Sequence, residues 1–270
     1  MDVGVIGLGL IGGSIAKALV QDLNVVGYDI DRSVVNAAFD AKIITHKALS
    51  LRDFARPKLI FLATPPAATI EVLQFLSSMN LEGTTITDCT GVKTPIFRNL
   101  SPKIKPFFVG GHPMAGKESG GLGASSGTLF EGSGWIITPS KETLPRCIDM
   151  VVDTVITFGS KPKLMSPEEH DRVVALVSQL PHIIAAALVT EATKFKTEGI
   201  TAGSWADLTR VAGSDPNLWV NLCLLNDVEL AHVIGRFILL LQEVQDGLET
   251  RNQDLIRNFF ERARNSKINS

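Results

Sequence analysis

Cysteine is scarce in this chain of 270 residues, and neither sign of charge dominates. The three cysteines, Cys89, Cys147 and Cys223, lie far apart and form no CxxC pair. This spacing supports neither a disulfide framework nor a zinc site, so we expect no bound metal and a reducing compartment. The net charge of −2 gives no reason to expect a nucleic acid or an anionic membrane as a partner.

Long uninterrupted apolar runs are also missing. The most apolar stretches, such as VALVSQLPHIIAAALV, contain glutamine, proline and histidine, which argues against a membrane-spanning helix. A strand-like run begins at residue 2, so we expect no signal or transit peptide. With 45% hydrophobic and 20% charged residues, the composition is that of an ordinary globular protein, and we expect a cytoplasmic location.

The first half of the chain alternates between strand-like and helix-like patterns. Near-continuous apolar strands with helical crossovers predict a parallel sheet covered on both faces, a Rossmann-like doubly wound α/β fold. The strand-like runs are 3–7, 24–29, 58–64, 84–88, 107–111 and 134–139, and the helix-like segments are 11–19, 32–41, 67–78, 94–99 and 142–157.

The pattern changes at Ser166, which has Pro167 and two acidic residues directly after it, as at a helix N-terminus. Residues 167–198 and 216–262 then read as helices. We therefore predict two domains, a nucleotide-binding domain at 1–163 and an all-α domain at 164–270. Residues 222–248 are apolar around most of the expected helix, which indicates packing against a second subunit.

The stretch GLGLIGGS fits a dinucleotide-binding loop between a strand and a helix. The first glycine turns the chain, the second lets the backbone approach a pyrophosphate, and the third allows close packing of helix and strand. The helix N-terminus then offers its N–H groups to the phosphates. We expect cofactor contacts from Gly7, Leu8, Gly9, Leu10, Ile11 and Gly12.

Asp29 ends the second strand-like run, 20 residues after the second glycine. A carboxylate there accepts hydrogen bonds from ribose hydroxyls and repels a 2′-phosphate, which favours NAD over NADP. Arg32 weakens this preference, since it could neutralise a 2′-phosphate. In FLATPP, Thr64 and Pro65 follow a strand and are expected to line the cofactor; a helix N-terminus with proline in its first turn is an equally compatible interpretation.

His112, in VGGHPMAG, follows a strand-like run and so lies at the cleft edge where a nicotinamide is expected. Two glycines before it leave room for a ligand, and its imidazole can take a proton at neutral pH, which predicts a catalytic role. Among the other histidines, we expect His46 to face solvent and His232 to lie in the core or an interface.

His170 and His182 lie twelve residues apart on one helical stretch. Twelve steps of about 100° place them about 120° apart on an ideal helix, and Pro181 is expected to bend that helix between them. Arg210, in DLTRVAGSDPNLW, is suited to bidentate capture of a carboxylate. The alternative for this arginine is a surface ion pair with a neighbouring aspartate.

Four stretches occur in a familiar order: GLGLIGGS, GGHPMAGKESG, SPEEHDRVVALVSQLPH and DLTRVAGSDPNLW. The chain resembles the prephenate/arogenate (cyclohexadienyl) dehydrogenases of tyrosine biosynthesis over essentially its whole length. The resemblance implies an N-terminal dinucleotide domain, a C-terminal helical domain that forms a homodimer, and an oxidative decarboxylation with hydride transfer to NAD.

The resemblance also implies roles for individual residues. His112 matches the family histidine that bonds the ring hydroxyl of the substrate and assists its deprotonation. Arg210 matches an arginine that binds a substrate carboxylate. His182 matches a histidine near the substrate side chain, and His170 the histidine of an EHD motif that supports the site.

One loop departs from the family pattern. The family has a serine that contacts the catalytic histidine and the ring hydroxyl, and Gly91 occupies its place here within the loop DCTGVK. Our hypothesis is that Thr90, one position earlier, supplies the hydroxyl instead, with Gly91 lying beside the substrate.

Three alternatives remain open. Arogenate differs from prephenate in carrying an ammonium group in place of a carbonyl, and His182 suits the keto acid somewhat better. A β-hydroxyacid-type dehydrogenase or a pyrroline-carboxylate reductase would place a different polar set, typically a lysine, on the first interdomain helix. A non-catalytic NAD-sensing protein would not need His112 and Arg210 together in one cleft.

Overall fold

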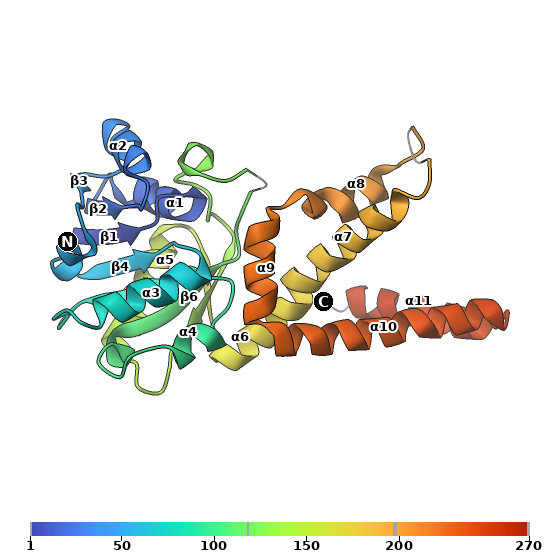
Figure 1. Cartoon of the computed structure of the whole chain (residues 1–270). Helices are drawn as coiled ribbons and strands as arrows, with labels where there is room; N and C mark the ends of the chain where they lie inside the picture. Colours follow the sequence, from blue (N-terminus) through green and yellow to red (C-terminus); the bar gives the residue numbers. More distant parts are fainter. Residues whose placement is uncertain (1, 118, 197–198, 269–270) are drawn as a thin grey trace.

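The computed structural model describes residues 2–117, 119–196 and 199–268. Figure 1 shows two parts, a sheet covered by helices and an arm of helices that extends away from it. The predicted combination of a doubly wound α/β domain and an all-helical segment is confirmed. Residue 1 of the first predicted domain, residues 269–270 of the second, and the last two residues of the predicted helix 167–198 lie outside the described residues.

The sheet has eight strands in the order β3-β2-β1-β4-β5-β6-β7-β8. Strands β1 to β6 pair in parallel, β7 runs antiparallel to β6, and β8 is parallel to β7. The order reverses between β1 and β4, which is where doubly wound sheets bind ligands. The strands are β1 (Asp2–Ile6), β2 (Asn24–Tyr28), β3 (His46–Lys47), β4 (Leu59–Leu62), β5 (Thr85–Asp88), β6 (Phe108–Pro113), β7 (Gly134–Thr138) and β8 (Lys161–Leu164).

Alternate side chains of the strands enter two separate cores, one on each face of the sheet. In β4, Leu59 and Phe61 join the core under α1 (Leu10–Leu19), α2 (Arg32–Asp40) and α5 (Pro145–Thr157). The intervening Ile60 and Leu62 join the core under α3 (Pro66–Leu76), α4 (Thr94–Arg98) and the turn η1 (Leu51–Ala55). Two further 3₁₀ turns are η2 (Lys105–Phe107) and η3 (Leu122–Ala124). Burial on both faces explains why these strands are apolar without alternation.

Two edge strands escaped the sequence analysis, and one strand runs against the expected direction. β3 is only two exposed residues long, and β8 reads KPKL with mostly exposed side chains, so neither carries an apolar signal. The predicted sheet is parallel through β6, and β7 departs from that direction by pairing antiparallel with the end of β6. Direction of pairing is not encoded in the apolar pattern of a single strand.

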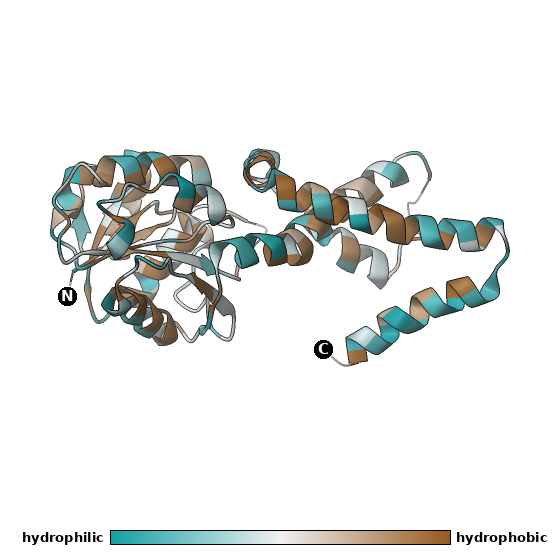
Figure 2. Cartoon of the chain, turned by 90° about the horizontal axis from the view of Figure 1, so that it is seen from below, coloured by the Kyte–Doolittle hydropathy of each residue, from teal (hydrophilic) through white to brown (hydrophobic). Residues whose placement is uncertain are grey.

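The second part of the chain is helical, as expected, but has little core of its own. Buried side chains are few, and large apolar ones such as Leu224, Val228 and Leu241 are exposed. In Figure 2 the apolar residues of the arm are brown along its helices. The elements are α6 (Pro167–Val174), the π-helical turn η4 (Ala175–Gln179), α7 (Leu180–Ala192), α8 (Gly203–Thr209), η5 (Arg210–Gly213), α9 (Pro216–Leu225), α10 (Asp227–Glu249) and α11 (Gln253–Ile268).

The run Pro167–Ala192 is long and apolar enough to cross a membrane by length and composition alone. Its first turns, however, contact the sheet domain through Asp171, which accepts hydrogen bonds from the backbone of Lys93 and Thr94. A π-helical turn precedes Pro181, a residue that has no N–H to donate, and the bend expected at this proline stays a prediction. We interpret this run as the link between the two parts.

Close packing at Gly12 gives a first prediction. A Cβ at this position would lie 1.8 Å from the backbone oxygen of Gly7, so Gly12→Ala must displace either the loop or α1. We expect a loss of about 1–3 kcal/mol in the free energy of unfolding, measured by denaturant titration. Gly203→Ala is the control, because a Cβ there meets nothing within 4 Å. Equal stability of the two variants would contradict the packing argument.

Candidate active site

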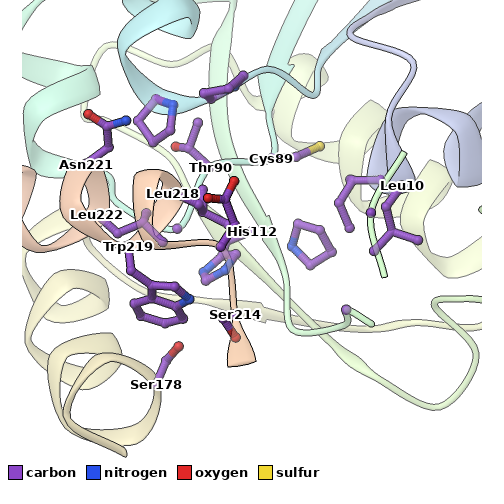
Figure 3. Close-up of a pocket in the computed structure, with 18 of the residues that line it drawn as sticks. Leu10, Cys89, Thr90, His112, Ser178, Ser214, Leu218, Trp219, Asn221 and Leu222 are labelled. Carbon is purple, nitrogen blue, oxygen red and sulfur yellow. The ribbon is translucent and has the colours of Figure 1, made fainter. Parts of the chain in front are cut away.

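A cavity of about 950 Å³ lies between the sheet and the helices α7 and α9. Its walls come from the carboxyl ends of β1, β4, β5 and β6 and from the first helices of the second part. Figure 3 shows His112 inside it, between Leu10 of α1 and Trp219 of α9. A second cavity of about 420 Å³ shares the segment 63–65 and extends along the glycine loop to Asp29.

The glycine loop has the geometry that its sequence predicts. Gly7 has a φ of +89°, and a Cβ there would lie 2.5 Å from the carbonyl oxygen of Ala63. Gly9 faces open space, so a ligand can approach its backbone directly. Helix α1 begins at Leu10 with no side chain capping its first N–H groups. Those groups, and the positive end of the helix dipole, are available to an anion such as a pyrophosphate.

Gly7, Gly9, Asp29, Thr64 and Pro65 all line the second cavity. Of the remaining loop residues, Leu10 and Ile11 line the large cavity, whereas Leu8 and Gly12 are buried behind the loop.

Asp29 fixes the loop from beneath, since its Oδ2 accepts the backbone N–H of Leu8 at 2.8 Å. Arg32 turns elsewhere: its guanidinium donates to the carbonyl oxygens of Ala48 and Leu49 and lies over the ring of Tyr28. It does not line either cavity. A contact between Arg32 and a cofactor stays a prediction, and the present geometry gives this side chain other partners.

The segment after β4 satisfies both interpretations of FLATPP. Thr64 lines both cavities and pairs its hydroxyl with that of Thr69 at 2.8 Å. Pro65 is the N-cap residue of α3, and Pro66 is the first residue of that helix. The prolines therefore start a helix at the place where a cofactor would lie.

His112 lies half-buried near the end of β6 and faces the large cavity. The Nδ1 of His112 is 2.9 Å from Nε2 of His170. The Nε2 of His112 lies beside Gly91, where an added Cβ would be 3.7 Å from it. Burial, the neighbouring His170 and the charge of Lys93 hold the pKa of His112 well below its usual value. The imidazole is therefore neutral at neutral pH and able to accept a proton.

His170 does not line the cavity but lies behind His112, fully buried in α6. Its Nδ1 is 2.7 Å from Oδ1 of Asp171. Burial lowers the pKa of His170, although the bond to Asp171 partly offsets this effect. Burial also raises the pKa of Asp171, yet the bonds from His170 and Thr94 outweigh it and leave the carboxyl ionised. His170 thus contacts His112 and does not line the cavity, and its role in supporting or binding the substrate stays a prediction.

A buried lysine that sequence reasoning passed over lies under the loop after β5. Lys93 is fully buried, bonds the carboxylate of Asp88 through Nζ, and donates to the hydroxyl of Thr90 at 3.0 Å. The Thr90 hydroxyl also bonds Asp88 and the carbonyl oxygen of Val92. Thr90 lines the cavity, and its hydroxyl bonds to the groups just named. The His112 ring instead bonds to His170. A catalytic role for Thr90 stays a prediction.

His182 and Trp219 form a stacked pair on the far wall, with ring centroids 3.7 Å apart. The carbonyl oxygen of Ser178 accepts from Nδ1 of His182 at 2.9 Å, so Nε2 is left for a ligand. Burial lowers the pKa of His182, and the charge of Arg210 lowers it further. Arg210 is therefore near His182, yet its side chain is exposed and does not line the cavity.

The structure brings His112, His170, His182, Thr90 and Gly91 to one side of the molecule and leaves the other two histidines outside. His46 is exposed, as predicted. His232 is also exposed, so it does not lie in the core of this chain, and the alternative that it lies in an interface stays a prediction. Trp219, Lys93 and Asp171 were missed as site residues, although each stands inside a stretch that the sequence analysis singled out. Among the described residues no group of three or more His, Cys, Asp or Glu could hold a metal ion.

Two family models match this chain. Residues 13–163 match the nucleotide-binding domain of prephenate dehydrogenase, and residues 166–262 match its dimerization domain. The chain belongs to the prephenate dehydrogenase family.

Its relatives agree with this family. The prephenate dehydrogenase of Bacillus subtilis is 30% identical over 96% of this chain and 73% of its own length. The cyclohexadienyl dehydrogenase of Zymomonas mobilis is 30% identical over 98% of this chain and 94% of its own. A crystal structure of prephenate dehydrogenase from A. aeolicus, in complex with hydroxyphenyl propionate and NAD+, is 30% identical, covers 100% of this chain and 98% of its own, and superposes with a TM-score of 0.90.

The depressed histidine pKa values predict how stability changes with pH. A histidine whose folded pKa lies below about 6.5 binds its proton more readily when unfolded, so stability is lost as pH falls below that value. We expect the free energy of unfolding to decrease from pH 7.5 to pH 5, measured by denaturant titration, and to decrease less in His112→Asn. A variant in which exposed His46 is replaced by Asn should follow the parent. A steeper slope in His112→Asn would show that burial does not depress this pKa.

Proposed function

We propose that this chain is an NAD-dependent prephenate dehydrogenase of tyrosine biosynthesis. The reaction is the oxidative decarboxylation of prephenate to 4-hydroxyphenylpyruvate with hydride transfer to NAD. The observation that carries the proposal is a neutral, half-buried imidazole, His112, facing a cavity that continues to a glycine loop of dinucleotide-binding geometry. Membership of the family and the 30% identity to a prephenate dehydrogenase bound to NAD+ support it.

In the reaction, His112 accepts the proton of the ring hydroxyl while that carbon becomes a carbonyl. NAD, when bound along the glycine loop, supplies the hydride acceptor. Loss of the ring carboxylate as CO2 makes the ring aromatic, so the step is effectively irreversible. The chain therefore chiefly has to orient the ring against His112 and exclude water from the cavity.

NAD is preferred over NADP on electrostatic grounds. Asp29 and Glu71 both line the second cavity, where the adenosine half of the cofactor would lie. Two carboxylates there repel a 2′-phosphate. The guanidinium of Arg32, which could have offset them, donates to backbone carbonyls instead.

Prephenate is preferred over arogenate by the groups near the substrate side chain. His182 is a neutral imidazole on the wall, and the charge of Arg210 contributes to lowering its pKa. Among the described residues that line the large cavity, the one acidic side chain is Asp215. Its carboxylate caps α9 by accepting the backbone N–H of Asn217. A keto acid fits this balance better than an ammonium group. Arogenate is the alternative substrate, in keeping with the cyclohexadienyl dehydrogenase relative.

We infer that the chain acts as a homodimer through the helices after residue 166. The exposed apolar side chains of α9 and α10 are the support from the structure, and the match to a dimerization domain is the support from the family. The division into 1–163 and 164–270 stays a proposal; in its support, the match to the nucleotide-binding domain ends at residue 163 and the match to the dimerization domain begins at residue 166. A cytoplasmic location fits three unpaired cysteines.

The central experiment mixes the protein with prephenate and NAD and follows NADH by absorbance, with the product identified by chromatography. Arogenate and NADP are run in parallel. His112→Asn should lower turnover about 10²-fold or more with little change in NAD affinity, because it removes the proton acceptor. No NADH from either substrate would reject the proposed function, and near-normal turnover in His112→Asn would remove that residue from the mechanism.

Arg210→Ala tests the predicted carboxylate contact. A charge-assisted hydrogen bond is worth about 1.5–3 kcal/mol, so the KM for prephenate should rise roughly tenfold to a hundredfold with a smaller change in kcat. Arg52→Ala, which removes an exposed guanidinium from the sheet domain, is the matched control. An unchanged KM in Arg210→Ala would show that this arginine does not bind the substrate.

A further inference from the structure

Three side chains lead from the cavity to a buried carboxylate. His112 Nδ1 lies 2.9 Å from His170 Nε2, and His170 Nδ1 lies 2.7 Å from Asp171 Oδ1. The exposed fractions of His170 and Asp171 are 0% and 2%, so no solvent competes for these bonds. Asp171 also accepts the backbone N–H groups of Lys93 and Thr94, each at 2.7 Å.

The positions of the protons follow from this arrangement one bond at a time. An ionised carboxylate only accepts hydrogen bonds, so the proton between Asp171 and His170 belongs to His170 Nδ1. A neutral His170 then has a bare Nε2, which is an acceptor. His112 must therefore donate to it through Nδ1, and the neutral His112 ring is left with a bare Nε2.

The bare nitrogen points to where a substrate can reach it. A Cβ added at Gly91 would lie 3.7 Å from His112 Nε2, so any larger side chain at this position could cover the nitrogen. Glycine has no side chain and leaves it open. The side chain of Leu222 of α9 lies on the other side of this position, with its Cδ2 3.2 Å from where that Cβ would be. His112, Gly91 and Leu222 all line the large cavity.

We propose that His170 and Asp171 are positioning residues that hold His112 in its Nδ1–H form and so present Nε2 to the cavity as a hydrogen-bond acceptor. This proposal rests on the proposed function, in which the accepted proton is that of the substrate ring hydroxyl. The electron pair of that O–H bond becomes part of the new carbonyl, while the hydride on the same carbon is transferred to NAD. The cation formed on His112 then donates a charge-assisted bond to His170, which in turn donates to the Asp171 carboxylate. The opposite ring form would present an N–H to the hydroxyl and could not take its proton.

The position of the proton can be observed without substrate or cofactor. In uniformly ¹⁵N-labelled protein at pH 7.5, NMR of the imidazole nitrogens distinguishes a protonated ring nitrogen from a bare one. The His112 signals are assigned by their loss in His112→Asn. We expect Nδ1 protonated and Nε2 bare in the parent protein. A parent His112 with its proton on Nε2 would overturn the proposal, whatever the variants do.

Two substitutions at His170 separate positioning from packing. His170→Gln retains a carbonyl oxygen to accept from His112 and an amide to donate to Asp171, whereas His170→Leu retains only volume. We expect kcat to fall about 10²-fold or more in the leucine variant, with NADH affinity unchanged, and to stay within about tenfold of the parent in the glutamine variant. The exposed His46 of the sheet domain, changed to Leu, is the control.

Equal losses in the two His170 variants would overturn the positioning role, and so would a His112 ring form that is unchanged in His170→Leu. If the leucine variant does not fold, the parent spectrum and the glutamine variant still decide. A protein with the expected ring form but no activity on prephenate or arogenate would reject the proposed function and leave the positioning role intact.

Discussion

The Asp171 carboxylate is the point on which the arrangement of the site depends. It lies in the first helix after the sheet domain, yet two of its three hydrogen-bond donors, the backbone N–H groups of Lys93 and Thr94, belong to that domain. These N–H groups stand at the start of α4, where helices lack partners for their first amides. One buried side chain thus caps a helix in the first domain, holds α6 against it, and receives the imidazole of His170.

This position makes the geometry of the base a consequence of how the domains meet. His112 comes from β6 and His170 from α6, so their 2.9 Å contact exists only while both domains keep their places. On the opposite wall, His182 and Trp219 both belong to the helical part and stack on each other there, so it is their placement relative to His112 that depends on how the domains meet. A reaction that needs little bond-making by the protein depends on such placement more than on reactive side chains.

The sequence was a good guide to whatever has a local pattern. The glycine loop, the covered strands, the switch to helices at Ser166 and the cleft position of His112 were each visible in a few adjacent residues. What escaped depends on contacts between distant segments. In the sequence, Lys93 is indistinguishable from a surface lysine, and only the fold shows that it is buried against Asp88. Asp171 is likewise indistinguishable from an exposed helical aspartate, and only the fold shows that it accepts a backbone N–H group of the other domain. The hydroxyl of Thr90 accepts a hydrogen bond from the buried Lys93, a partner that no local pattern in the sequence predicts.

Burial has opposite consequences for the two tasks of a base. Removing His112 from water keeps it unprotonated, and so ready, across the neutral range, but it also weakens its hold on the proton it must take. A carboxylate in direct contact would restore that hold and would also favour the protonated state at rest. Placing Asp171 one imidazole further away separates the two effects, because the neutral His170 keeps the carboxylate out of contact with His112 at rest, and its bonds to both groups strengthen once His112 is charged. An intervening ring between base and anion is therefore a way to keep a buried histidine both free of its proton at rest and stabilised once charged.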